Sequence, residues 1–139
     1  MKIKNKGFTL VELVVVIAIV GILAGLTLTA SMSSRKVARD GKRKADLEQI
    51  RSALEIYRSD CKTYPASITF GSALMGCGNT YMDKIPNDPL SGYTYSYLGF
   101  SNSYVLCSYL ETDKTIDYSA GGACGTNCGG GCYYKVTNY

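Results

Sequence analysis

The sequence contains no histidine, and this absence excludes several kinds of chemistry. A Ser-His-Asp or Cys-His nucleophile cannot be built, and a zinc site with histidine ligands is equally impossible. A c-type haem is excluded as well, because its attachment motif is Cys-x-x-Cys-His. No other recognisable nucleophile arrangement is present, so we do not expect an enzyme.

Proline is absent before Pro65, so nothing in the first part of the chain forbids a long helix. Apolar residues recur there at three- and four-residue spacing and form one stripe: Leu47, Ile50, Leu54 and Tyr57. We predict one nearly continuous helix over residues 8–59.

Charge is almost absent from residues 8–30, in which Glu12 is the only charged side chain. The eighteen residues that follow it, 13–30, are about enough to cross a bilayer as a helix. The competing interpretation is a secretory signal peptide, whose apolar core is shorter, roughly 7–15 residues, and precedes an A-x-A-like site. No such site follows this run. We therefore expect it to remain on the protein as a membrane anchor.

The formal net charge of +4 depends largely on the first residues of the chain. Three of the fifteen cationic side chains, Lys2, Lys4 and Lys6, precede the apolar run. Without residues 1–7, twelve cationic side chains face eleven acidic ones. A chain so close to neutrality is not expected to bind nucleic acid through its overall charge.

All six cysteines lie beyond residue 60, and in so small a chain they indicate an oxidising compartment and disulfides. Fifteen pairings are possible; we favour Cys61 with Cys77, which would tie the end of the helix to the following loop. Metal binding is the alternative, but the x3 spacing of the last three cysteines differs from the usual C-x2-C. The disulfide candidates are Cys61, Cys77, Cys107, Cys124, Cys128 and Cys132.

Beyond residue 59 the chain is rich in glycine, serine and tyrosine, with turn signals around its three prolines. Tyrosines alternate with small polar residues over 93–97, which is strand periodicity. Residues 103–110 and 132–137 are the next strand candidates. We expect an α+β fold, in which a small antiparallel sheet packs on the apolar stripe of the helix. About 80 residues cannot build a large core, so disulfides would stabilise this head.

The segment Lys6-Gly7-Phe8-Thr9-Leu10-Val11-Glu12, followed by the apolar run, resembles the leader and cleavage site of type IV prepilins. The resemblance implies that a prepilin peptidase cuts between Gly7 and Phe8 and methylates the new terminus at Phe8. It also implies a pilin fold, self-assembly into a helical polymer, and two further partners, an assembly ATPase and a platform protein.

Glu12 matches a glutamate of that family, and its position has a physical consequence. A carboxylate inside an apolar helix costs a few kcal/mol if it is unpaired. The amino terminus created at Phe8 of a neighbouring subunit is a cation that could pair with it and set the axial register of assembly. The alternative is a carboxylate that reaches the lipid headgroups and favours the helix N-terminus.

Gly21 and Gly25 form a G-x-x-x-G pair within the apolar run. Small residues at this spacing let helices approach closely. We therefore consider them helix-packing candidates, although ordinary membrane-helix composition would also account for them.

Residues Ile85–Pro89, then Gly92, Tyr93 and Tyr95, are similar to a Pro-x-Asp-Pro…Tyr-x-Tyr region in the major pseudopilins of type II secretion. Several of those bind calcium in a loop near the C-terminus. The nearest acidic residues here are Asp113 and Asp117, which are either calcium ligands or solvated turn carboxylates. The cysteine-rich loop that follows departs from the pattern. No other cofactor is expected.

Six cations follow the apolar run, and by the positive-inside rule they would place the head in the cytoplasm. The peptidase motif and the cysteines both require the head outside, and we give them precedence. The cations could bind lipid headgroups, pair with acidic groups of neighbouring subunits, capture DNA or simply form a solvated helix face. They are Arg35, Lys36, Arg39, Lys42, Arg43 and Lys44.

The leading hypothesis is a structural subunit of a type IV pilus-like filament, anchored in the inner membrane before assembly and extracellular afterwards. A type II secretion or competence pseudopilin, in the periplasm or cell wall, is the close alternative. A low-copy membrane-tethered or tip adhesin is the alternative from another class. The expected parts are a leader, a membrane or filament-core helix half, an amphipathic helix half and an extracytoplasmic head: residues 1–7, 8–30, 31–59 and 60–139.

Overall fold

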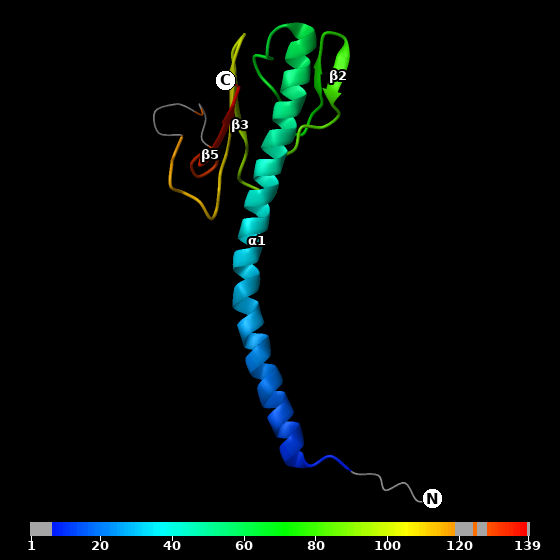
Figure 1. Cartoon of the computed structure of the whole chain (residues 1–139), viewed down its shortest axis with the longest axis vertical. Helices are drawn as coiled ribbons and strands as arrows, with labels where there is room; N and C mark the ends of the chain where they lie inside the picture. The colour runs from blue at the N-terminus through cyan, green and yellow to red at the C-terminus, as the bar shows by residue number, and fades with distance from the viewer. Residues whose placement is uncertain (1–6, 119–123, 125–127, 139) are drawn as a thin grey trace, which may run out of the picture. The chain divides into compact units, whose positions relative to one another are not determined.

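The computed structural model describes residues 7–118, 124 and 128–138, and the side chains of all of these except residues 27–31 (Figure 1). The chain divides into two compact units, Met1–Arg35 and Lys36–Tyr139. The described residues form one helix, α1 (Leu10–Cys61), and five strands: β1 (Leu74–Gly76), β2 (Asn79–Met82), β3 (Ser96–Gly99), β4 (Tyr104–Ser108) and β5 (Tyr134–Thr137). The predicted α+β class, with one long helix and small antiparallel sheets, is confirmed.

Helix α1 begins and ends about two residues later than predicted. It ends after Cys61 because Lys62 adopts a left-handed conformation, with φ of 64°. The Lys62 N–H still donates to the Arg58 carbonyl at 2.9 Å, and the Lys62 ammonium donates to the Ser59 carbonyl at 2.7 Å. These bonds satisfy carbonyls that the end of a helix would otherwise leave unpaired.

The head contains two antiparallel sheets, which lie on different sides of the C-terminal part of α1 (Figure 1). Strands β1 and β2 form a hairpin, with Gly76 opposite Asn79. The other sheet has the order β3-β4-β5, so that β4 is central; Ser96 lies opposite Cys107, and Leu106 opposite Val136.

The main core forms between α1 and the sheets. Leu47, Ile50 and Leu54 of the predicted stripe are completely buried, and Tyr57 packs against them. The sheets contribute apolar residues from β1, β4 and β5: Leu74, Tyr104, Leu106 and Val136. The prediction that a small sheet packs on this stripe is therefore confirmed.

A second core consists mainly of cysteine and tyrosine, and four of its members are joined by disulfides, Cys107–Cys124 and Cys128–Cys132. Tyr109 is also buried there. The third disulfide joins Cys61 to Cys77, the pair favoured from the sequence, and thereby ties the end of α1 to the turn of the β1–β2 hairpin.

The strands near Tyr93 and at 74–82 differ from the sequence-based expectation. Strand β3 begins at Ser96 rather than Tyr93, because Tyr93 and Thr94 contact the second core and Tyr95 packs into the main core. The Tyr93 ring lies 4.4 Å from the Tyr109 ring, and the Thr94 N–H donates to the Cys128 carbonyl at 3.4 Å. The β1–β2 hairpin was not predicted at all.

Candidate assembly site and ionic clasp

Gly7 and Phe8 lie ahead of α1, outside regular secondary structure, and both are exposed. A Cβ atom built on Gly7 would meet nothing within 4 Å, and the Phe8 side chain is 90% exposed. A peptidase needs an accessible, non-helical peptide bond in its cleft, so the Gly7–Phe8 bond is sterically available.

Glu12 is hydrogen-bonded to Thr9 within the same chain. Its carboxylate accepts from the Thr9 N–H at 2.9 Å and from the Thr9 hydroxyl at 2.8 Å. The Glu12 N–H donates to the Thr9 hydroxyl oxygen at 3.3 Å. This reciprocal arrangement is a capping box, in which Thr9 is the N-cap and Glu12 the third helical residue. Sequence reasoning missed it, although Thr-x-x-Glu before an apolar run is its signature.

In the helix that follows, the described large apolar side chains are not buried. From Phe8 to Leu26 every described large apolar side chain is exposed, and the least exposed, Val14, still shows 49% of its surface. A Cβ atom built on Gly21 or Gly25 would meet nothing within 4 Å. Within the part of α1 whose side chains are described, no stretch is both long and apolar enough to cross a membrane.

In the head, a buried ionic cluster joins α1 to two loops, and we call it the ionic clasp. The side chains of Arg43 and Asp88 are both 0% exposed, and the guanidinium Nε and Nη2 donate to the two carboxylate oxygens at 2.8 and 2.9 Å. Arg43 Nη1 also donates to Asp40 at 2.8 Å and to Glu111 at 3.0 Å. Arg39 binds Glu111 through two bonds of 2.7 Å. The clasp consists of Arg39, Asp40, Arg43, Asp88 and Glu111.

Asp40 also orders the loop that follows β4. Its carboxylate accepts the N–H groups of Glu111 and Thr112 at 2.8–3.1 Å and the Thr112 hydroxyl at 2.6 Å. Burial by itself would raise the pKa of Asp40, but these bonds and the one from Arg43 outweigh it, and the pKa is lowered. Bonds from Arg39 lower the pKa of Glu111 as well.

The clasp revises the interpretation of the basic cluster. Arg39 and Arg43 are paired within the head and are not part of a solvated helix face. Lys44 lies over the Tyr134 ring, at 5.4 Å from its centre. Arg35, Lys36 and Lys42 are exposed, and for these the contacts with headgroups, neighbouring subunits or DNA stay predictions.

The two calcium candidates occupy turns. Asp113 accepts the hydroxyl and N–H of Thr115 at 2.8 and 3.2 Å, and Asp117 accepts the Cys132 N–H at 3.3 Å. Among the described residues, no three side chains of the histidine, cysteine, aspartate or glutamate type gather at a position where they could hold a metal ion. Calcium binding by Asp113 and Asp117 stays an untested prediction.

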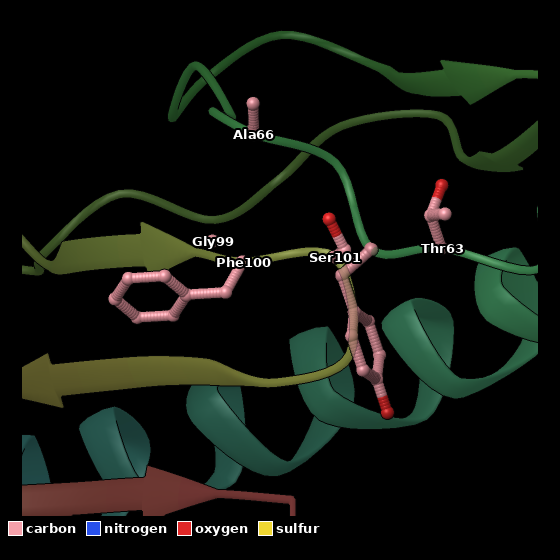
Figure 2. A pocket seen from close by; sticks show the side chains of 6 residues that line it. Thr63, Ala66, Gly99, Phe100 and Ser101 are labelled. Carbon is pink, nitrogen blue, oxygen red and sulfur yellow. The ribbon is translucent and has the colours of Figure 1, made fainter.

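A shallow groove of 420 Å³ lies between the end of β3 and the segment that follows α1 (Figure 2). Figure 2 shows Gly99, Phe100 and Ser101 on one side and Thr63 and Ala66 on the other. Tyr64 completes the lining. Its hydroxyl donates to Glu55 at 2.8 Å, and no general base and nucleophile stand together among the lining residues.

Two models of known protein families match this chain, one over its N-terminal part and one over most of the remainder. A model of the prokaryotic N-terminal methylation motif matches residues 2–28, and one of type II secretion system protein G matches residues 30–123.

Several relatives are named type II secretion system core protein G. The one from Pseudomonas aeruginosa is 36% identical, over 68% of this chain and 74% of its own length. The relative from Escherichia coli K12 is 38% identical, over 85% of this chain and 82% of its own length. The relative from Vibrio cholerae is 29% identical, over 98% of this chain and 92% of its own length. No solved structure matches significantly.

Proposed function

The chain belongs to the family of type II secretion system protein G, a pilin-like family, and on that premise we propose that it is the main structural subunit of a type II secretion pseudopilus. The family match confirms the resemblance to prepilins. Among the functions left open by the sequence, it favours the pseudopilin. The observation that carries the proposal is the protein G match over residues 30–123, because it includes the helix stripe and most of the head.

The role is structural rather than enzymatic. The head is built from a helix stripe, two small sheets and three disulfides. Histidine is absent, so the commonest general base is unavailable. What the chain offers instead is an exposed apolar helix, which needs partners outside its own unit.

Maturation would create the surface that assembles. A prepilin peptidase would cut between Gly7 and Phe8 and methylate Phe8, in keeping with the N-terminal methylation motif over residues 2–28. The apolar helix would first anchor the chain in the inner membrane, with the head in the periplasm. Helices from many copies would then pack together, and Gly21 and Gly25 would allow close approach.

The Glu12 carboxylate would have a partner both in the single chain and in the assembled fibre. In the single chain Thr9 satisfies its carboxylate. In the fibre, the methylated terminus at Phe8 of a neighbouring subunit would supply a cation, and that contact would fix the axial register. An assembly ATPase and a platform protein of the secretion machine would drive the transfer of each subunit from the membrane to the fibre.

The test is deletion of the gene in the source organism, followed by measurement of exported enzymes in the medium and the periplasm. We expect the enzymes to accumulate in the periplasm and the wild-type gene to restore their release. Gly7→Leu should fail to restore it. Gly41→Ala is the matched control and should succeed, because Gly41 lies in the helix with open space around it.

Two outcomes would favour the alternatives. Normal secretion together with loss of long surface filaments would indicate a pilus subunit. A few copies at filament tips, seen with an antibody to the head, would indicate an adhesin.

A further inference from the structure

The three disulfides differ in how far solvent reaches them. Cys77 is exposed and Cys61 is half-buried, so the disulfide that they form lies at the surface of the head. The cysteines of the other two disulfides are at most 1% exposed: Cys107, Cys124, Cys128 and Cys132. A disulfide opens or forms when a thiolate attacks one of its sulfurs, so access decides which disulfide can react in the folded chain.

The two buried disulfides can be reached only if the second core opens. Cys107 lies in β4, the central strand of its sheet. The Tyr118 N–H donates to the Cys132 carbonyl at 2.7 Å, and the Thr94 N–H donates to the Cys128 carbonyl at 3.4 Å. An attacking thiolate would have to wait until these contacts break. Such local opening costs free energy, so exchange at these disulfides should be slow.

Cys77 has a backbone conformation that does not suit its side chain. Gly76 lies opposite Asn79, so Cys77 and Gly78 form the two-residue loop of the β1–β2 hairpin. Their φ angles are 51° and 84°, both positive, as a type I′ turn requires. Glycine and asparagine adopt this conformation readily, whereas other side chains meet a steric penalty. The disulfide to Cys61 therefore restrains a turn that is intrinsically unfavourable for cysteine.

Other contacts hold the β1–β2 hairpin on α1, and they do not involve this turn. Leu74 is only 4% exposed and belongs to the main core. The Tyr81 ring lies 5.1 Å from the Tyr57 ring, and its hydroxyl donates to Asp60 at 3.1 Å. Opening of the disulfide should therefore loosen the tip of the hairpin and leave the head folded.

We propose that Cys61–Cys77 is a redox-sensitive site on the folded head, at which a dithiol oxidoreductase opens the disulfide and thereby loosens the β1–β2 turn. The inference goes beyond the proposed function, because it concerns the single chain and does not require a fibre. The buried disulfides of the second core stay closed under the same conditions.

The exchange takes place in two steps. A thiolate of the dithiol attacks Sγ of Cys77, the more exposed cysteine, and a mixed disulfide forms while Cys61 leaves as a thiolate. The second thiolate of the dithiol then attacks the mixed disulfide and releases Cys77. Two electrons pass to the protein, the dithiol becomes a disulfide, and its two protons end on Cys61 and Cys77. An oxidised dithiol closes the bond by the reverse steps.

The first test is limited reduction of the full chain in detergent micelles. Dithiothreitol at about pH 8 supplies the thiolate, and rapid alkylation followed by peptide mapping identifies the cysteines that were released. The same chain in guanidinium chloride gives the rate for each disulfide without the fold. Relative to those rates, we expect the folded chain to open Cys61–Cys77 at least roughly 100-fold faster than the disulfides of the second core. Equal ratios for all the disulfides would overturn the proposal.

Reduced thioredoxin tests the protein partner, because it is a dithiol that must contact the surface of its substrate. We expect it to open Cys61–Cys77 and to leave the second core intact. If dithiothreitol opens this disulfide and thioredoxin does not, the claim that an oxidoreductase acts at this site is wrong.

The second test measures amide hydrogen exchange in the hairpin. In a Cys61→Ser and Cys77→Ser double variant, we expect the amides of residues 75–80 to exchange roughly tenfold faster than in the wild type. Those of β3, β4 and β5 should be unchanged. If this variant does not fold, the selectively reduced wild type gives the same comparison. Unchanged exchange over residues 75–80 would show that the disulfide does not restrain the turn.

A Cys61→Ser and Cys77→Asn double variant is the matched control. It lacks the disulfide as well, but asparagine accepts the positive φ at position 77. We expect its turn to exchange more slowly than that of the serine variant, and equal rates would contradict the argument from the backbone. None of these measurements depends on secretion, so failure of this proposal and failure of the proposed function are separate results.

Discussion

Arg43 and Asp88 form a two-bond ion pair between fully buried side chains, although 45 residues separate them in the chain. Arg43→Met would leave the Asp88 carboxylate buried without its cation. We expect this change to destabilise the head by about 3–5 kcal/mol. Denaturant unfolding of the full chain in detergent, with disulfides intact, measures the effect.

The matched control for that measurement is Arg51→Met. Arg51 pairs with Glu48 at 3.2 Å, and both side chains are 49% exposed. Loss of an exposed pair costs at most about 1 kcal/mol. Equal losses for Arg43→Met and Arg51→Met would contradict the assignment of Arg43 to a buried clasp.

The clasp should make the head sensitive to acid. The pKa values of Asp40 and Glu111 are lowered in the folded chain, so their contribution to stability is complete above their unfolded values, about 3.9 and 4.3. It is lost as the pH falls through the lower, folded values. We expect a nearly constant melting temperature at neutral pH and a steep fall below about pH 4. The Asp40→Asn variant should have a lower melting temperature at neutral pH, and that temperature should fall less steeply as the pH is lowered. An unchanged steepness would argue against a contribution of the Asp40 carboxylate to acid sensitivity.

Variants of Thr9 and Glu12 distinguish the capping of α1 from the part that Glu12 plays in assembly. Thr9→Val removes the capping hydroxyl and should cost about 1 kcal/mol of helix stability. Glu12→Val removes the cap and also the carboxylate that would pair with a neighbouring terminus, so fibre formation should fall sharply. Glu12→Asp should be intermediate, because the charge remains and the reach shortens. The measurement is the fraction of variant subunits in sheared fibres when wild type and variant are co-expressed.

If Glu12 acts only as a cap, Thr9→Val and Glu12→Val will impair incorporation equally. We expect Thr9→Val to be much the milder change. Normal fibres built from Glu12→Val subunits alone would show that this carboxylate does not set the assembly register.

The disulfides should contribute according to the loops they close. Cys61–Cys77 spans 16 residues and Cys128–Cys132 spans 4. Chain-entropy arguments give a loss of about 3 kcal/mol for the first pair and about 2 kcal/mol for the second when both cysteines become serine. Denaturant unfolding measures both variants. Labelling of the unreduced protein should find no reactive thiol, and stoichiometric zinc would contradict the pairing.

The sequence predicted α1 and its apolar face well, since Leu47, Ile50 and Leu54 follow helical periodicity and that periodicity is a local property. It also predicted β4, which lies within the strand candidate over residues 103–110. The β1–β2 hairpin was missed because its strands have only three and four residues, too few for alternation to be recognised.

The clasp could not be predicted because its members are distant in sequence. Arg43 stands among exposed cations, and nothing local distinguishes it from Lys42 or Lys44. Its burial depends on Asp88 and Glu111, which the fold brings to it. The capping box at Thr9 was predictable, because its signature is contiguous.

The most direct test of the account is the intact mass of subunits released from sheared fibres. Cleavage and methylation predict a chain of residues 8–139 that carries one methyl group and three disulfides. The full 139-residue chain in assembled fibres would contradict the claim that this protein is a processed, pilin-like subunit that assembles through its N-terminal helix.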